Sequence, residues 1–159
     1  ALYAPGASMR IVTFAWTTPA LLAGVKAVTR RFWDDGYAKS FVAGDLVAAW
    51  DRSPRAHGRK VATIRLARAP YLEALCTAPD EDWEREGFRW LSEKGARVQG
   101  HPPEVIWRAW KIGAVHGEKW WVVRFSVESL TDSGLDIALQ HGGTPFGAVT
   151  GGGPSSLSD

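Results

Sequence analysis

The segment KWWVVRFSVE, at residues 119–128, is the sequence feature that most restricts the fold of this chain. Large apolar side chains occupy every second position, at Trp121, Val123, Phe125 and Val127. This alternation is the side-chain period of a β-strand, in which successive residues point to opposite faces of a sheet. The segment therefore predicts a strand, and it is the clearest strand signal in the chain.

Strand and helix signals are interleaved along the rest of the sequence. β-branched and aromatic residues predict further strands at 10–16, 27–33, 46–50 and 59–69. Capping residues, first-turn prolines, terminal glycines or apolar stripes predict helices at 17–24, 71–75, 80–95 and 102–110. The glycine-containing segment between the second and third strands, 34–45, is typical of a loop. This mixture predicts an α+β domain with a curled or closed sheet.

The two ends of the sequence differ in composition from the region between them. Residues 1–9 include the only methionine, Met9, and directly precede a strand-like segment, so we interpret them as an extension or a tag remnant. Residues 131–159 are rich in Gly, Pro and Ser without lasting periodicity, which predicts a flexible tail. The folded domain is therefore expected at residues 10–130.

The composition excludes several classes of protein. No run approaches the roughly 18 apolar residues that a membrane span needs. The single cysteine, Cys76, excludes an internal disulfide and a zinc site built from several thiolates, and it fits a reducing, cytoplasmic location. No convincing set of metal ligands and no Gly-rich phosphate loop is present, so neither metal nor cofactor is expected. The net charge of +2 permits nucleic-acid binding without requiring it.

The segment GVKAVTRRFW, at residues 24–33, concentrates cations and a hydroxyl beside two aromatic side chains. The strand period places Arg30 and Arg31 on opposite faces, so that one of them points toward a cleft. A guanidinium there suits a phosphate or a base edge, whereas the alternative is an ion pair with one of the nearby aspartates, Asp34, Asp35 or Asp45.

Three aromatic residues near this segment are candidates for stacking on a base. Trp16 and Trp33 border it, and Tyr37 follows in the predicted loop. The alternative for the two tryptophans is core packing. A second cation-rich stretch, RSPRAHGRK at residues 52–60, either follows a nucleic-acid backbone or forms the solvated tip of a hairpin.

The cationic segment resembles the GxKxxTxR signature of the ASCH domains, a branch of the PUA-like superfamily. The matching positions, with the following GD pair, are Gly24, Lys26, Thr29, Arg31, Gly44 and Asp45. Residues 86–88, EGF, match an acidic residue that the family has at the head of a helix. The resemblance implies a PUA-like small mixed β-barrel flanked by helices, with a cleft beside the signature.

The resemblance also implies two kinds of activity. Family members are associated with RNA binding, and some small bacterial members hydrolyse acylated cytidine amides with a lysine, a threonine and a glutamate. The corresponding residues here are Lys26, Thr29 and Glu86. A desolvated lysine can act as a base, a hydroxyl as nucleophile and a carboxylate as proton shuttle. The alternative is a structural ion pair between Lys26 and Glu86.

The sequence therefore favours an RNA-binding or nucleoside-binding module whose ligand contacts the signature. The residues expected to bind it are Lys26, Thr29, Arg30, Arg31, Trp16, Trp33, Tyr37 and Asp45. One alternative is a metal-independent amidohydrolase of N4-acylated cytidine. A second alternative is a protein-interaction domain that uses the tryptophans of residues 102–110. The chain departs from the family pattern at two places. Residue 27 is alanine where the family commonly has threonine, and the segment 95–119 is longer than the pattern requires and is positioned to cover or reshape the cleft.

Overall fold

The computed structural model describes residues 9–113 and 118–141 of the chain. Its strands form one six-stranded sheet in the order β1-β3-β4-β6-β2, and β5 also pairs with β6. β1 runs parallel to β3, and the other pairs are antiparallel. Their bounds are β1 Ile11–Thr13, β2 Val28–Arg31, β3 Leu46–Trp50, β4 Lys60–Leu66, β5 Tyr71–Ala74 and β6 Lys119–Leu130.

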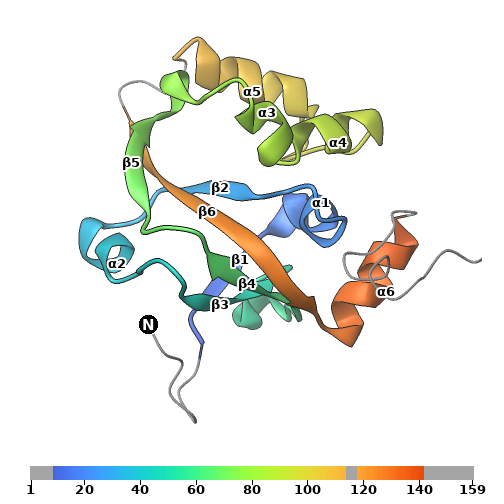
Figure 1. The fold of residues 1–159 in the computed structure, drawn as a ribbon. Coiled ribbons are helices and arrows are strands. Elements are labelled where there is room, and N and C mark those ends of the chain that lie inside the picture. Colours follow the sequence, from blue (N-terminus) through green and yellow to red (C-terminus); the bar gives the residue numbers. More distant parts are fainter. Residues whose placement is uncertain (1–8, 114–117, 142–159) are drawn as a thin grey trace, which may run out of the picture.

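The longest strand, β6, holds the sheet together, and it contains the segment with the clearest alternation in the sequence. Its first half pairs with β2 on one edge and β5 on the other, and its second half pairs with β4. The sheet curls around this strand into a half-barrel (Figure 1). The expected α+β class, a small mixed sheet that curls toward a barrel and is flanked by helices, is confirmed.

Helices cover the sheet at several places. α3, α4 and α5 form a layer above β2 and β6, whereas α1 and α6 lie beside the opposite end of the sheet from α2 (Figure 1). Short 3-10 turns, η1 to η3, connect some of these elements. The bounds are η1 Ala15–Thr17, α1 Thr18–Leu22, α2 Asp35–Lys39, η2 Pro54–Ala56, η3 Leu75–Thr77, α3 Asp82–Arg85, α4 Phe88–Glu93, α5 Pro103–Lys111 and α6 Asp132–Gln140.

Two predictions of secondary structure in the first half of the domain are wrong. Residues 71–75 were expected to be helical, but β5 pairs with β6 in register from Tyr71↔Val122 to Ala74↔Lys119. Pairing with a long neighbouring strand outweighs the weak helix preference of so short a segment. The predicted loop at 34–45 contains α2, whose first turn is capped by the Asp34 carboxylate accepting a hydrogen bond from the Tyr37 N–H.

Two further predictions need correction nearer the C-terminus. The helix predicted at 80–95 is divided into α3 and α4 at Gly87, whose φ of 85° is left-handed. Part of the segment interpreted as a flexible tail is helix α6, which Thr131 caps by accepting a hydrogen bond from the Gly134 N–H. Ile137 and Ala138 of this helix are buried against the main core, so packing keeps it ordered. Residues 142–159, also part of that tail, and residues 1–8 of the predicted extension lie outside the described residues.

Two apolar clusters stabilise the domain. The larger one fills the inside of the half-barrel and contains Phe14, Leu21, Phe41, Ile64 and Phe125 among others. The smaller one lies between α1, α4 and α5. Within the described ranges, the helices are all too short or too polar to cross a membrane.

Candidate functional site

The signature segment, residues 24–31, begins where α1 ends and continues into β2. Gly24 has a φ of 78°, which allows the chain to turn sharply after α1. The Lys26 N–H then donates to the carbonyl oxygen of Ala20, and the Ala27 N–H donates to that of Arg85. These two backbone bonds fix the lysine between α1 and the end of α3.

Lys26 and Glu86 form the ion pair that sequence reasoning left open as an alternative to catalysis. The lysine Nζ lies 3.1 Å from Glu86 Oε2 and donates at 2.9 Å to the Glu86 carbonyl oxygen. Their side chains are only 1% and 3% exposed. Gly87 lets the chain after Glu86 pack closely against α1, because a Cβ at its position would lie 2.5 Å from the Ala20 Cβ.

Arg30 lies in the same buried region and contacts carboxylates from two elements. Its guanidinium reaches Glu86 at 3.0 Å, Glu73 of β5 at 2.9 Å and Asp82 of α3 at 2.5 Å. Arg124 of β6 adds a bidentate contact to Asp82, at 3.1 and 2.9 Å. We call these six residues the buried charge cluster: Lys26, Arg30, Arg124, Glu73, Asp82 and Glu86.

The buried charge cluster is balanced, with three cations and three carboxylates. Burial lowers the pKa of Lys26, although the charge of Glu86 opposes this shift. Burial acts to raise the pKa of Asp82, but hydrogen bonds from Arg124 and Arg30 outweigh it and hold that pKa below its usual value. Burial therefore decides the direction for Lys26, whereas hydrogen bonds from two arginines decide it for Asp82.

Helix α5, part of the segment 95–119 that is longer than the family pattern requires, lies over this cluster. The Arg30 guanidinium carbon lies 5.9 Å from the centre of the Trp110 ring, within the range of a cation–π contact. Trp110 in turn packs on Phe88 of α4, with ring centres 5.3 Å apart. The long segment therefore contacts the buried charge cluster through Trp110, and its expected effect on a cleft stays a prediction. His116 lies outside the described residues.

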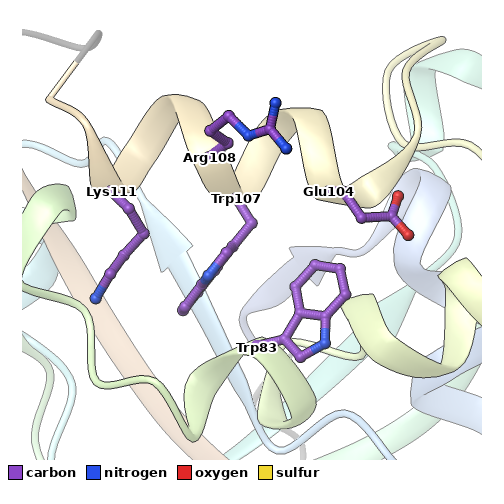
Figure 2. A pocket seen from close by; sticks show the side chains of 5 residues that line it. All are labelled: Trp83, Glu104, Trp107, Arg108 and Lys111. Atoms are coloured by element: carbon purple, nitrogen blue, oxygen red, sulfur yellow. The ribbon is translucent and has the colours of Figure 1, made fainter.

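The other tryptophan of α5 helps to form a shallow cavity of about 430 Å³ between α3 and α5. Trp107 projects from α5 toward Trp83 of α3, and Lys111 follows one turn later (Figure 2). Lys111 Nζ donates at 2.6 Å to the Ala78 carbonyl oxygen and lies 3.2 Å from Asp80. Both α5 tryptophans are thus partly buried by packing within the domain, and the protein-interaction hypothesis stays a prediction.

Arg31 has surroundings that differ sharply from those of Arg30. Its guanidinium donates to the Thr13 carbonyl oxygen of β1 and lies 5.3 Å from the centre of the Phe14 ring. None of the carboxylates in the described parts of the chain lies within 4.0 Å of it, so the alternative interpretation, an ion pair with a nearby aspartate, is not what these residues form. Its buried Nε also has no hydrogen-bond partner there. Burial lowers the pKa of Arg31, and the charge of Glu86 opposes this shift.

The remaining predicted site residues near the signature form an aromatic group beside α2. The Trp33 ring stacks on Phe41 with centres 5.1 Å apart, and the Tyr37 ring packs edge-on against both. Tyr37 is 37% exposed. Asp45 of the GD pair accepts from the Val42 N–H and pairs with Arg10 at 3.1 Å, so it stabilises its own turn.

Two other predicted residues are placed differently from the rest. Thr29 lies opposite Val123 of β6 and is buried, and its hydroxyl makes no hydrogen bond to any described residue. Trp16 lies in η1 and lines another cavity, whose lining includes no residue of the signature segment. The structure therefore joins Lys26, Arg30 and Glu86, and it leaves Trp16 apart from them.

Sequence reasoning missed half of the buried charge cluster. Asp82 precedes Glu86 by one helical turn in the acidic run of residues 80–86, which was a usable signal. Arg124 was visible as a charge in the alternating strand, but nothing in the sequence indicated its partner. Glu73 was assigned to a helix and therefore gave no signal. In the described ranges, no three His, Cys, Asp or Glu side chains gather to hold a metal ion.

The class of protein that fold and site define is an α+β half-barrel with a balanced charge cluster beneath a tryptophan-containing helix. Among solved structures, protein EF3133 from Enterococcus faecalis V583, described as family DUF984, is similar with a TM-score of 0.50 and 13% identity. The match covers 79% of this chain and 84% of that chain. At this identity the likeness is evidence for the fold alone. No family model matches the chain, and no curated protein matches it.

Proposed function

We propose that this protein is an ASCH-like, PUA-like domain that binds RNA, or a nucleoside unit derived from RNA, beside the signature segment. The observation that carries the proposal is the contrast at β2, where Arg30 is neutralised by carboxylates and Arg31 is not. The match of residues 24–31 to the signature supports the same interpretation.

The electrostatics of Arg31 favour an anionic ligand. A cation withdrawn from water without a counter-charge lowers stability, and an anion that contacts it recovers that energy. The guanidinium offers a planar fork that fits a phosphate group. Tyr37 belongs to the aromatic group of α2 and is partly exposed, so a base bound near the phosphate has a ring to stack on.

A titration with cytidine 5′-monophosphate and with cytidine tests this proposal by calorimetry. We expect Arg31→Gln to weaken binding of the nucleotide by about tenfold or more, because one charge-assisted contact is lost. Binding of cytidine should change less, since it has no phosphate. The matched control is Arg55→Gln, which removes an equal charge from an exposed loop position. Equal losses in both variants, or no nucleotide binding by the parent protein, would refute the proposal.

A second candidate function, the metal-independent amidohydrolase of N4-acylated cytidine, is favoured by one specific observation. Lys26 has a lowered pKa and contacts Glu86 directly, which are the properties required of a base and its proton shuttle. In this mechanism a water attacks the amide carbonyl, or Thr29 attacks it and a water then hydrolyses the ester formed on Thr29. The C–N bond breaks as the leaving nitrogen takes up a proton, and the products are cytidine and the free acid. Both charged side chains are buried, so the residues that cover them must move before a substrate reaches them.

A panel of acylated nucleosides tests this candidate with purified protein. Lys26→Ala and Thr29→Val should each abolish turnover, and Glu86→Gln should lower it by about two orders of magnitude. Circular dichroism of each variant establishes that the fold is retained. Turnover that survives in Lys26→Ala belongs to another site. Absence of turnover across the panel would contradict the hydrolase candidate and leave the binding function as the only one of the two.

A further inference from the structure

A second cavity, of about 940 Å³, lies on the side of the domain where α1 stands between α4 and α6 (Figure 1). Residues from η1, the β3–β4 loop, the end of α4 and the end of α6 line it. We call this cavity the basic groove, defined by Trp16, Trp90, Arg52, Arg59, Lys94 and Arg97.

Positive charge is concentrated in the basic groove. Its lining has four Lys or Arg side chains and one carboxylate, Asp51, which pairs with Arg59 at 3.7 Å. Arg52, Lys94 and Arg97 have no carboxylate within 4.0 Å among the described residues. The whole chain has a net charge of only +2, so the local excess in the groove exceeds that of the molecule.

Two tryptophans are interleaved with these cations. Trp16 is 55% exposed, an unusual position for the largest aromatic side chain in a domain that has two apolar clusters. Trp90 is partly exposed, and the Lys94 Nζ lies 5.4 Å from the centre of its ring. The residue before Trp16, Ala15, has a φ of 43°, a strained value that concentrates at functional positions.

A buried polar atom in the same lining also lacks a partner. Thr18 is only 3% exposed, yet its hydroxyl oxygen makes no hydrogen bond to any described residue. Buried hydroxyls are almost always hydrogen-bonded in native proteins, and an exception at a cavity points to a missing ligand or bridging group. The groove therefore has cations, ring faces and an unsatisfied hydroxyl.

We propose that the basic groove binds single-stranded nucleic acid, with the cations along the phosphates and Trp16 stacked on a base. Unpaired cations alone fit any polyanion, but an exposed ring among them fits a strand with unstacked bases. The proposal is independent of the function proposed for Arg31, because no residue of the signature segment lines this groove.

Fluorescence anisotropy with a labelled oligouridylate of about ten nucleotides tests the proposal. We expect Trp16→Ala to weaken binding by about tenfold or more, since one stacking contact is lost. Lys94→Ala/Arg97→Ala should make the slope of log affinity against log salt shallower by about 1.4, because two phosphate contacts disappear. The matched control is Arg65→Ala/Arg89→Ala, which removes two exposed cations that lie outside the groove and pair with glutamates.

Three results would overturn the proposal. The first is an equal loss of affinity in the control and groove variants, and the second is an unchanged affinity in Trp16→Ala. The third is displacement of the labelled oligouridylate by polyglutamate, or by anionic phospholipid vesicles, as effectively as by the unlabelled oligonucleotide. A parallel titration with an oligodeoxyuridylate shows whether the ribose 2′-hydroxyl contributes to the affinity. Cytidine 5′-monophosphate binding should be unchanged in Trp16→Ala, so failure at the groove is distinguishable from failure at Arg31.

Discussion

Arg30 and Arg31 are neighbours on one short strand, yet they occupy opposite electrostatic surroundings. Arg30 contacts three carboxylates within 3.0 Å, and Trp110 of α5 contacts it. Arg31 reaches across to β1, where it finds a backbone carbonyl and an aromatic ring instead of a carboxylate. The strand period explains why they diverge, because adjacent side chains project to opposite faces.

The difference separates two roles for the same residue type. A charge that is fully paired inside the protein contributes to the fold, and its removal leaves its partners uncompensated. A charge that is desolvated without a partner lowers stability, which natural proteins tolerate mainly where binding needs it. We therefore assign Arg30 to structure and propose Arg31 as the ligand-binding residue.

The largest effect is expected from Arg30→Met. This change leaves the carboxylates of Glu86, Glu73 and Asp82 buried with too few cations, so the free energy of unfolding should fall by about 3–5 kcal/mol. Urea denaturation measures it, with Arg55→Met as the exposed control that should change stability by about 0.5 kcal/mol or less. If Arg30→Met lowered the free energy of unfolding by less than about 1 kcal/mol, the structural role assigned to Arg30 would be contradicted.

A smaller effect is expected from Gly87→Ala, which disturbs the close packing of the chain after Glu86 against α1. The new Cβ would lie 2.5 Å from that of Ala20, at a φ of 85°. We expect the free energy of unfolding to fall by about 2–3 kcal/mol. Gly95→Ala is a matched control, because Gly95 has a φ of 68° and open space around its Cβ position, and it should lose only about 1 kcal/mol. Similar losses in both variants would mean that the close contact at Gly87 is unimportant.

The pH dependence of stability sharpens the comparison further. The pKa of Asp82 is lowered in the folded protein, so its contribution is complete above the unfolded value of 3.8 and disappears as the pH falls toward the folded pKa. The unfolding free energy of the parent protein should therefore fall more steeply below that pH than that of Asp82→Asn. Arg124→Gln, which removes one of the two cations that donate hydrogen bonds to Asp82, should show an intermediate slope. Identical slopes of unfolding free energy against pH in all three proteins would contradict a stabilising role for the Asp82 carboxylate.

Much of the fold could be predicted from local pattern. The alternation at β6 and the prolines that open α1 and α5 are signals carried by adjacent residues. β5 was missed because four residues hold too little pattern, and its state depends on pairing with β6. α6 was missed because glycine-rich neighbours masked a capped helix whose burial depends on tertiary contacts.

The candidate site was less predictable, for a physical reason. Lys26 and Glu86 are 60 residues apart, and only the family resemblance suggested that they meet. The contrast between Arg30 and Arg31 followed from the strand period, but which of them would be paired depended on the positions of α3 and β5. The basic groove is assembled from four separate segments, and only Trp16 and the cations of residues 52–60 were noticed in advance.

The most direct test of this account is the unfolding free energy of Arg31→Met with and without cytidine 5′-monophosphate. Without nucleotide, we expect this variant to be within about 1 kcal/mol of the parent protein or more stable, because a desolvated charge is removed. At a hundredfold excess over Kd, the nucleotide should stabilise the parent protein by about 2.7 kcal/mol and leave the variant almost unchanged. A variant that loses as much stability as Arg30→Met, and is stabilised by the nucleotide as strongly as the parent, would contradict the account.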